Sequence, residues 1–211
     1  MRTILICLFF LPYSHSFAGE IKPKRIKHEK DSSIFRFNKS FYFGGGTTIF
    51  LGEFDQYHNS TQPFVFGIQF ATYKFSVNWN AHTGNSQPKK AISTPSYSIP
   101  IDTLNYFLMH EIGIGYEVLR TRNWQITPQF GVSTFQMGWT NQQIDKNDSP
   151  IVPNILLAND VIYRFKTFKL KTGGAVGFDL RYRLSWAPFK FDKDLRGKFL
   201  NNQLSIGFFG Y

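Results

Sequence analysis

Residues 171–184 read KTGGAVGFDLRYRL, and their alternation decides the fold class. Every second position in the second part of this segment is apolar: Val176, Phe178, Leu180, Tyr182 and Leu184. The positions between them are small or charged. Successive side chains of a β-strand point to opposite faces, so the segment predicts a strand with one apolar and one polar face. A transmembrane barrel strand has this pattern, because its outer face meets lipid and its inner face meets a polar interior.

Similar segments recur along the whole chain. We expect eight strands, at residues 40–51, 63–72, 75–82, 104–119, 124–140, 155–165, 171–184 and 203–211. Each can supply roughly the length of about 9–11 residues that a tilted strand needs to cross a bilayer.

The connections between these segments alternate strictly between short and long. The short ones are residues 73–74, 120–123 and 166–169, and the long ones are 52–62, 83–103, 141–154 and 185–202. Transmembrane barrels have short periplasmic turns and longer extracellular loops. The sequence therefore predicts an all-β fold, an eight-stranded antiparallel up-and-down transmembrane β-barrel. The alternative is a soluble β-sandwich, which has no reason to segregate its loops in this way.

The first residues have the pattern of an export signal. Met1 and Arg2 precede an apolar run over residues 4–11, and Ser16-Phe17-Ala18 then supplies small residues for cleavage. We expect a signal peptide at 1–18, a basic periplasmic leader at 19–39 and the barrel at 40–211. Cys7, the one cysteine, lies within the predicted signal, so no disulfide is expected in the mature chain.

The composition limits both the class of membrane protein and the class of binding partner. Aromatic residues make up 18% of the chain, yet the mean hydropathy is −0.24. No later apolar run approaches the roughly 20 residues of a membrane helix, so a helical membrane protein is excluded.

The formal net charge is +10. Because export argues against nucleic acid, we expect outer-membrane lipid and lipopolysaccharide as partners, with an external protein partner left open. No cofactor is expected.

The last strand ends in Gly207-Phe208-Phe209-Gly210-Tyr211, which resembles the C-terminal signal of bacterial outer-membrane proteins. From residue 40 to 211 the chain resembles the small eight-stranded outer-membrane barrel superfamily, which includes proteins of the OmpA, OmpX and OmpW types. The resemblance rests on topology, aromatic content and the terminal Tyr211. It implies a range of functions, from envelope anchoring and adhesion to small pores and lipid-modifying enzymes.

Charged residues occupy inward positions of the predicted strands. We expect a lumen charge network of Glu111, Glu117, Asp160, Arg164, Asp179, Arg181 and Arg183. An eight-stranded barrel is just wide enough inside for side chains to fill it, and buried charges must pair. The network is thus interpreted as a plug, and a narrow polar pore is the alternative.

Few residues of the sequence are candidates for catalysis. His82, expected at the rim of the second long loop with Ser86 nearby, is the one histidine placed for an enzyme that modifies outer-leaflet lipid. The sequence there is His82-Thr83-Gly84, without the His-x-Ser motif of lipid A deacylases. No catalytic, cofactor-binding or metal-ligating residue is assigned. Residues 44–46 are three glycines with no helix after them, which predicts close backbone approach and argues against a phosphate loop.

Basic residues gather in two of the long connections. The candidate lipopolysaccharide contacts are Lys89, Lys90, Lys190, Lys193, Arg196 and Lys198. Arginine and lysine attract lipid phosphates. The leading hypothesis is a non-enzymatic outer-membrane barrel, closed inside by charge pairs and contacting lipopolysaccharide or an external partner through its loops. The alternatives are an outer-leaflet lipid-modifying enzyme and a small pore.

Overall fold

The computed structural model describes residues 37–93, 98–99, 101, 105–139, 153–171, 174–190 and 196–210. All of them belong to one compact unit, Ser33–Tyr211. The predicted signal peptide, the leader up to residue 36, Lys193 and Tyr211 lie outside the described residues.

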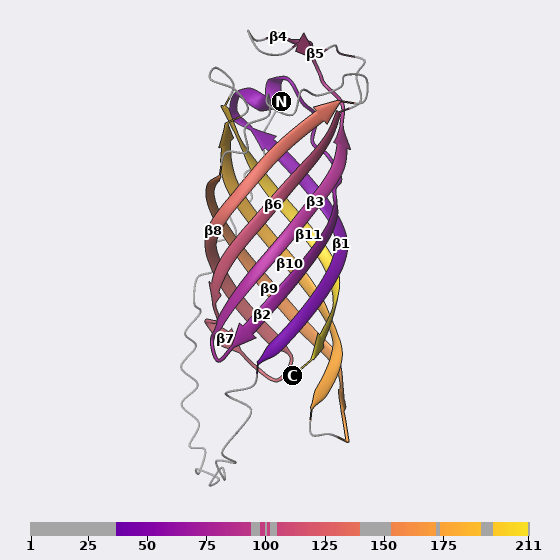
Figure 1. The fold of residues 1–211 in the computed structure, drawn as a ribbon, viewed down its shortest axis with the longest axis vertical. Coiled ribbons are helices and arrows are strands. Elements are labelled where there is room, and N and C mark those ends of the chain that lie inside the picture. The colour runs from indigo at the N-terminus through magenta and orange to yellow at the C-terminus, as the bar shows by residue number, and fades with distance from the viewer. Residues whose placement is uncertain are drawn as a thin grey trace, which may run out of the picture. The chain divides into compact units, whose positions relative to one another are not determined.

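Eight long strands form the barrel (Figure 1). They are β1 (Asn38–Leu51), β2 (Phe64–Thr72), β3 (Phe75–Ser86), β6 (Asn105–Tyr116), β8 (Trp124–Trp139), β9 (Asn154–Lys169), β10 (Ala175–Lys190) and β11 (Arg196–Gly210). Each pairs antiparallel with the next long strand in the chain, and β1 pairs with β11 to close the ring. The predicted eight-stranded up-and-down barrel is confirmed.

Among the described residues, four short elements lie in the connections between the long strands. They are the 3-10 helix η2 (Gly52–Gln56) and the two-residue strands β4 (Ile92–Ser93), β5 (Ser98–Ile99) and β7 (Leu119–Arg120). In Figure 1 the tight connections and the end of β11 lie at the lower end, and η2, β4 and β5 lie at the upper end. We call these the turn end and the loop end. No helix among the described residues is long and apolar enough to cross a bilayer.

Two predicted connections were wrong, because the strands beside them are longer than expected. Residues 166–169 were expected to be a turn, but they continue β9, and the chain reverses at residues 170–174. A bulge at Phe165 shifts the register there, since Arg164 pairs with Asp179 and Lys166 with Phe178. The expected long loop 185–202 is mostly strand, because β10 and β11 stay paired up to Lys190 and Arg196.

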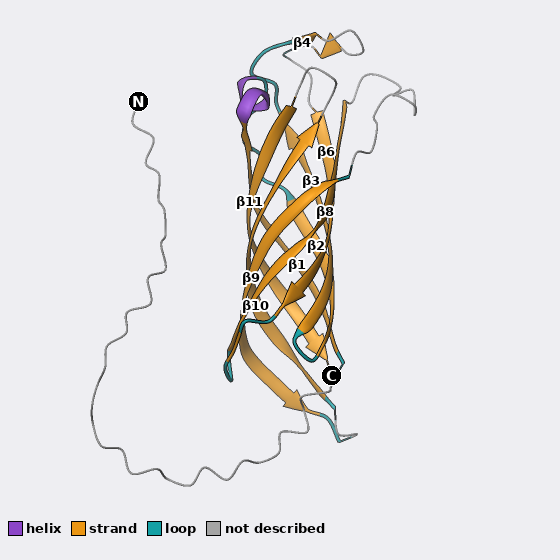
Figure 2. Ribbon diagram, turned by 90° about the vertical axis from the view of Figure 1, so that its left-hand side faces the viewer, coloured by secondary structure: helices purple, strands orange, loops and turns teal. Residues whose placement is uncertain are grey.

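The outer face of the barrel is apolar (Figure 2 shows the strands that carry it). Its exposed side chains include Phe41, Phe43, Phe66, Phe70, Val77, Ile112, Ile114, Phe130, Val132, Leu157, Leu180, Tyr182, Leu184, Leu204, Ile206 and Phe208. Aromatic residues, among them Trp124, Tyr73 and Tyr116, are exposed near the turns. We call this set the apolar belt; single exposed apolar residues are ordinary, but a continuous apolar surface around a whole sheet is not.

The three glycines of β1 sit where the barrel closes. A Cβ on Gly44 would overlap the carbonyl oxygen of Leu204, and one on Gly46 would overlap that of Asn202. Both glycines let β1 approach β11 more closely than any larger residue would, which confirms the expected role of close backbone approach.

Candidate functional site

The middle of the lumen holds four fully buried charged residues, which we call the charge network. The Arg183 guanidinium lies 2.7 Å from Oδ1 of Asp160 through Nη1 and 2.9 Å from Oε2 of Glu111 through Nη2. Arg181 Nη1 lies 3.5 Å from the other oxygen of Asp160. Two arginines therefore face two carboxylates and their formal charges cancel, as buried charges require.

Neutral side chains complete the coordination of both carboxylates. Ser185 Oγ donates to Oε1 of Glu111 at 2.6 Å, and Asn201 Nδ2 donates to the same oxygen at 3.0 Å. Gln129 Nε2 donates to Oδ2 of Asp160 at 2.7 Å. Each carboxylate oxygen thus accepts a hydrogen bond or faces a cation, which stabilises the ionised form in a site without water contact.

A ring of polar residues surrounds the side of the network nearer the turn end. The Arg181 guanidinium lies 3.9 Å from the centre of the Tyr42 ring, and its Nη2 donates to Gln69 at 2.8 Å. The Tyr42 hydroxyl donates to Asn80. These contacts hold Arg181 by a cation–π interaction and hydrogen bonds from several strands.

The lumen toward the loop end is filled by apolar side chains, which we call the aromatic plug. It comprises Phe50, Phe54, Phe107, Met109, Phe135, Met137, Leu156, Ala187, Phe189 and Phe199. The η2 helix supplies Phe54, whose ring lies 4.9 Å from that of Phe189 and 5.0 Å from that of Phe50, both edge-on. The first long connection therefore caps the barrel from inside.

His58 follows η2 and is fully buried beneath this cap. Its ring stacks on Phe54 at 4.6 Å, and Nδ1 lies 3.2 Å from Oγ of Ser86. Burial, followed by the nearby charge of Lys89, lowers the pKa of His58 to about 4. The histidine is thus neutral at pH 7. Ser86 is buried as well and donates to the carbonyl of Asn59, so this pair faces no surface that a substrate reaches.

His82 was expected at the rim, and this placement was wrong. Strand β3 extends to Ser86, so His82 lies inside the lumen, where Nε2 is 3.5 Å from Oε2 of Glu111 and Nδ1 is 3.2 Å from Gln203. Ser86 instead lies beside His58. The described residues contain no group of three or more His, Cys, Asp or Glu side chains placed to hold a metal ion.

Three of the seven residues expected in the lumen network lie toward the turn end, and among the described residues no ion pair joins them to the four at mid-barrel. Glu117 Oε2 pairs with Nη2 of Arg120 at 2.7 Å. Arg164 Nη2 donates to Gln125 at 2.8 Å, and Asp179 lies beneath Gly207. All three face inward, as the alternation predicted, and Asp179 precedes Arg181 by two positions on the same face of β10, so its charge acts on Arg181.

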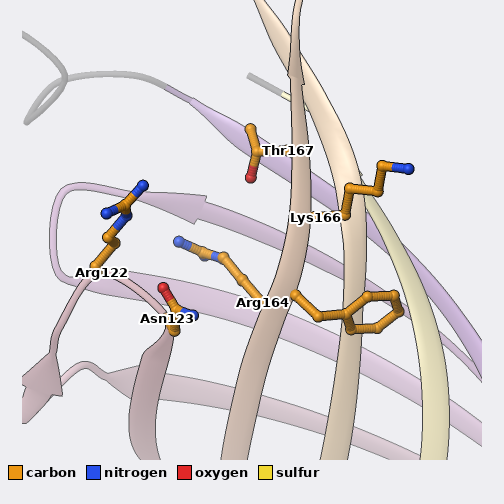
Figure 3. A pocket seen from close by; sticks show the side chains of 6 residues that line it. Arg122, Asn123, Arg164, Lys166 and Thr167 are labelled. Atoms are coloured by element: carbon orange, nitrogen blue, oxygen red, sulfur yellow. The ribbon is translucent and has the colours of Figure 1, made fainter.

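The turn end carries a pocket of about 500 Å³, drawn in Figure 3. Its lining residues are Arg122, Asn123, Arg164, Phe165, Lys166 and Thr167. In Figure 3 the polar ends of Arg122, Arg164, Asn123 and Thr167 point toward one space, and Lys166 points away from it. None of these six residues is acidic.

The candidate lipopolysaccharide contacts that the structure describes all lie at the loop end. Lys89 Nζ is held 2.9 Å from Oδ1 of Asp55. Lys90, Lys190, Arg196 and Lys198 are exposed. Lys190, Arg196 and Lys198 lie on the ends of β10 and β11, where a loop was expected.

No protein-family model matches the sequence, and no curated protein sequence matches it. Among solved structures, it is similar to Neisserial surface protein A, with 11% identity, a TM-score of 0.49, and coverage of 82% of this chain and 95% of that one. It is also similar to the outer membrane protein OprG from Pseudomonas aeruginosa, with 11% identity, a TM-score of 0.43, and coverage of 84% and 96%. A third similar structure is Ail, the attachment invasion locus protein of Yersinia pestis, in complex with the heparin analogue sucrose octasulfate, with 9% identity, a TM-score of 0.45, and coverage of 82% and 99%.

The strand pairing itself decides the fold. Eight antiparallel strands close in chain order, with tight turns at one end and apolar side chains facing outward. The chain has the fold of the small eight-stranded outer-membrane β-barrels.

Proposed function

We propose that this protein spans a bacterial outer membrane as a non-conducting barrel and binds lipopolysaccharide through the cations of its loop end. The single observation that carries the proposal is the combination of an apolar belt outside and a filled lumen inside. A closed barrel satisfies its backbone hydrogen bonds within the sheet, so its outer face is free to meet hydrocarbon. The predicted signal peptide at residues 1–18 provides export in this proposal.

The filled lumen favours a binding or anchoring role over transport. In the charge network, Arg183 of β10 reaches Glu111 of β6, and β8 and β9 lie between these strands in the sheet. In the aromatic plug, rings from β1, β10 and η2 meet. Two layers of different chemistry thus lie one above the other, and an ion crossing the barrel would have to displace both.

The cations at the loop end favour a phosphorylated lipid as the partner. Lys190, Arg196 and Lys198 lie on the paired ends of β10 and β11, because Lys190 is opposite Arg196 and Lys198 is opposite Pro188. Cations fixed on a strand hairpin lose less conformational entropy on binding than cations of a free loop. In an outer membrane, this end would face the lipopolysaccharide leaflet.

The test is binding of the full chain, folded in a nonionic detergent, to lipopolysaccharide. The variant K190Q/R196Q/K198Q should bind at least tenfold more weakly, because it removes three phosphate-facing charges. The matched control is K74Q/K169Q/K171Q, three exposed lysines of the turn end that do not line its pocket, which removes the same charge and should bind as the wild type does. Equal losses in both variants would show nonspecific attraction and contradict the assignment.

Two further measurements separate the alternatives. In planar bilayers, the wild-type protein should give no single-channel current at any voltage, and regular conductance steps would show a pore. Mass spectrometry of lipid A from cells with and without the protein should show the same acyl pattern. An altered pattern would show a lipid-modifying enzyme.

A further inference from the structure

The structure assigns a second binding site to this protein: the turn-end pocket between Arg122 and Arg164 takes a phosphate group. The site lies at the opposite end of the barrel from the cations proposed to bind lipopolysaccharide. The inference that the phosphate belongs to a phospholipid of the inner leaflet rests on the proposed membrane-spanning role. The phosphate chemistry of the pocket rests on its own residues.

The two arginines reach the pocket from different elements. Arg122 lies in the connection between β7 and β8, and Arg164 lies on β9 next to the bulge at Phe165. Their side chains converge on one space in Figure 3, together with the hydroxyl of Thr167 and the amide of Asn123. Arginine presents a planar set of donors that matches the oxygens of a phosphate, and the Thr167 hydroxyl adds a neutral donor. The Asn123 amide nitrogen already donates to the Tyr163 hydroxyl at 3.5 Å.

Contacts hold the Arg164 side chain in place, but they do not use all of the N–H donors of its guanidinium. Its guanidinium lies 5.0 Å from the centre of the Phe209 ring, and Nη2 donates to Gln125. The Nε atom of Arg164 is buried and has no hydrogen-bond partner. Because this atom is out of reach of a ligand in the pocket, a phosphate would be bound by the Nη atoms of the guanidinium.

The walls of the pocket are built before a ligand arrives. The amide of Thr121 donates to the carbonyl of Trp124 at 2.8 Å, and the amide of Trp124 donates to Thr121 Oγ at 3.0 Å. The amide of Arg164 donates to the carbonyl of Asn123 at 2.7 Å, which ties this turn to β9. Backbone bonds thus hold Arg122 and Asn123 beside Arg164, so little ordering is needed on binding.

The surrounding charge favours an anion. Besides the three cations that line the pocket, five more among the described residues lie at this end of the barrel: Lys39, Lys74, Arg120, Lys169 and Lys171. Among the described residues, the acidic side chains near the pocket are Glu117 and Asp179, and Glu117 is paired with Arg120. The field at the pocket is therefore positive, which raises the local concentration of anions.

The level of the pocket relative to the membrane interface favours a lipid phosphate. Trp124 follows Asn123 directly and is exposed on the outer face, where its ring is tilted against that of Tyr163 with the ring centres 4.8 Å apart. Aromatic residues of this kind lie at the membrane interface, level with the headgroups. Phe165, which lines the pocket, is also exposed. A phospholipid could place its phosphate on the arginines and its glycerol against Phe165.

The test measures binding by calorimetry to the full chain in a nonionic maltoside detergent at about 0.15 M salt, where surface attraction is screened. The probes are dihexanoylphosphatidylglycerol, inorganic phosphate and dihexanoylglycerol, which has the same tails without phosphate. The variants are R122Q, R164Q, R164K and R122Q/R164Q, and R196Q at the loop end is the control of equal charge. Arg122 is exposed, so R122Q should fold even if R164Q does not.

We expect both phosphate probes to bind the wild type. Binding should weaken about threefold to tenfold in R122Q and at least tenfold in R122Q/R164Q, with R196Q unchanged and R164K intermediate. If phosphatidylglycerol binds much more tightly than inorganic phosphate, the site takes a lipid headgroup, and similar affinities indicate a soluble phosphate compound. The proposal is overturned if R122Q binds as the wild type does, if R196Q weakens binding equally, or if dihexanoylglycerol binds as well as the phosphate probes. None of these outcomes depends on whether the barrel spans a membrane, which is tested by membrane fractionation.

Discussion

Arg183 Nη2 lies 2.9 Å from Oε2 of Glu111, although the two residues are 72 positions apart and their strands are not neighbours in the sheet. The contact joins β10 to β6 across the inside of the ring. It fixes the distance between strands that share no backbone hydrogen bonds. The charge network is therefore a cross-brace of the barrel as well as an obstruction of its lumen.

The first prediction concerns this brace. Arg183→Met leaves Glu111 and Asp160 without their shared cation in a buried site, which should lower the free energy of unfolding by about 3–5 kcal/mol. The double variant Glu111→Gln with Arg183→Met restores charge balance, because Arg181 remains beside Asp160. Urea unfolding in liposomes, followed by tryptophan fluorescence, should show the double variant to be more stable than Arg183→Met alone. A double variant whose loss equals the sum of the two single losses would show that the residues do not interact. Lys198→Met, at an exposed position, serves as the control.

The second prediction concerns barrel closure. Gly44→Ala places a Cβ against the Leu204 carbonyl of β11, whereas the Cβ of Gly45→Ala would have Pro63 O as its nearest neighbour at 3.6 Å. Overpacking of this kind costs about 1–3 kcal/mol. Gly44→Ala should therefore reduce the folded fraction in heat-modifiability gels, and Gly45→Ala should not. Equal behaviour of the two variants would mean that the close approach of β1 and β11 is not required.

The third prediction concerns pH and the loop-end cap. The pKa of His58 is about 4 when the cap is closed, and about 6.5, the ordinary value of a histidine, when the cap is open. The open state therefore binds more protons between these values, and cap stability rises with pH across that window. The full contribution is present above about pH 6.5, falls as the pH drops toward 4, and amounts to roughly 3 kcal/mol by linkage.

Limited chymotrypsin digestion at a series of pH values, corrected for the activity of the protease, measures opening of the cap through cleavage at Tyr57. Wild-type cleavage should increase as the pH falls from 6.5 to 4. His58→Phe keeps an aromatic ring on Phe54 and removes the titrating group, so its cleavage should stay constant over the same range. Lys89 repels the protonated imidazole of His58 and so lowers its pKa. Lys89→Gln removes this repulsion and should raise the apparent pKa of His58. A wild-type profile as flat as that of His58→Phe would rule out His58 as the sensitive group.

Strand alternation predicted much of this molecule from sequence. It placed Leu180 and Tyr182 outside and Arg181 and Arg183 inside, because a period of two is independent of tertiary contacts. It could not say which inward charges meet. Residues from distant strands reach the same level of the lumen only through strand tilt and register.

Because the predicted ends of two strands were wrong, two residues of the lumen were missed. Ser185 and Asn201, which both donate to Glu111, were assigned to a long loop, although they continue the inward alternation of β10 and β11. Extending the period of two past Leu184 would have found Ser185. The pocket between Arg122 and Arg164 gave no such signal, because the bulge at Phe165 and the turn at residues 121–124 break the period.

The last prediction concerns the apolar belt. Leu184 is exposed on β10 next to Arg183 of the mid-barrel charge network, and in the proposed membrane its side chain meets hydrocarbon. Leu184→Arg should then destabilise the barrel folded in liposomes by about 2–4 kcal/mol, because an arginine near the bilayer midplane is costly. Leu51→Arg, at an exposed site on the last residue of β1, tests the same change at the edge of the bilayer, where the expected cost is about 0–1 kcal/mol. The comparison is made by urea titration in liposomes. Because both leucines are exposed in the protein alone, a soluble barrel would tolerate both changes equally, and only a membrane distinguishes the two positions by depth.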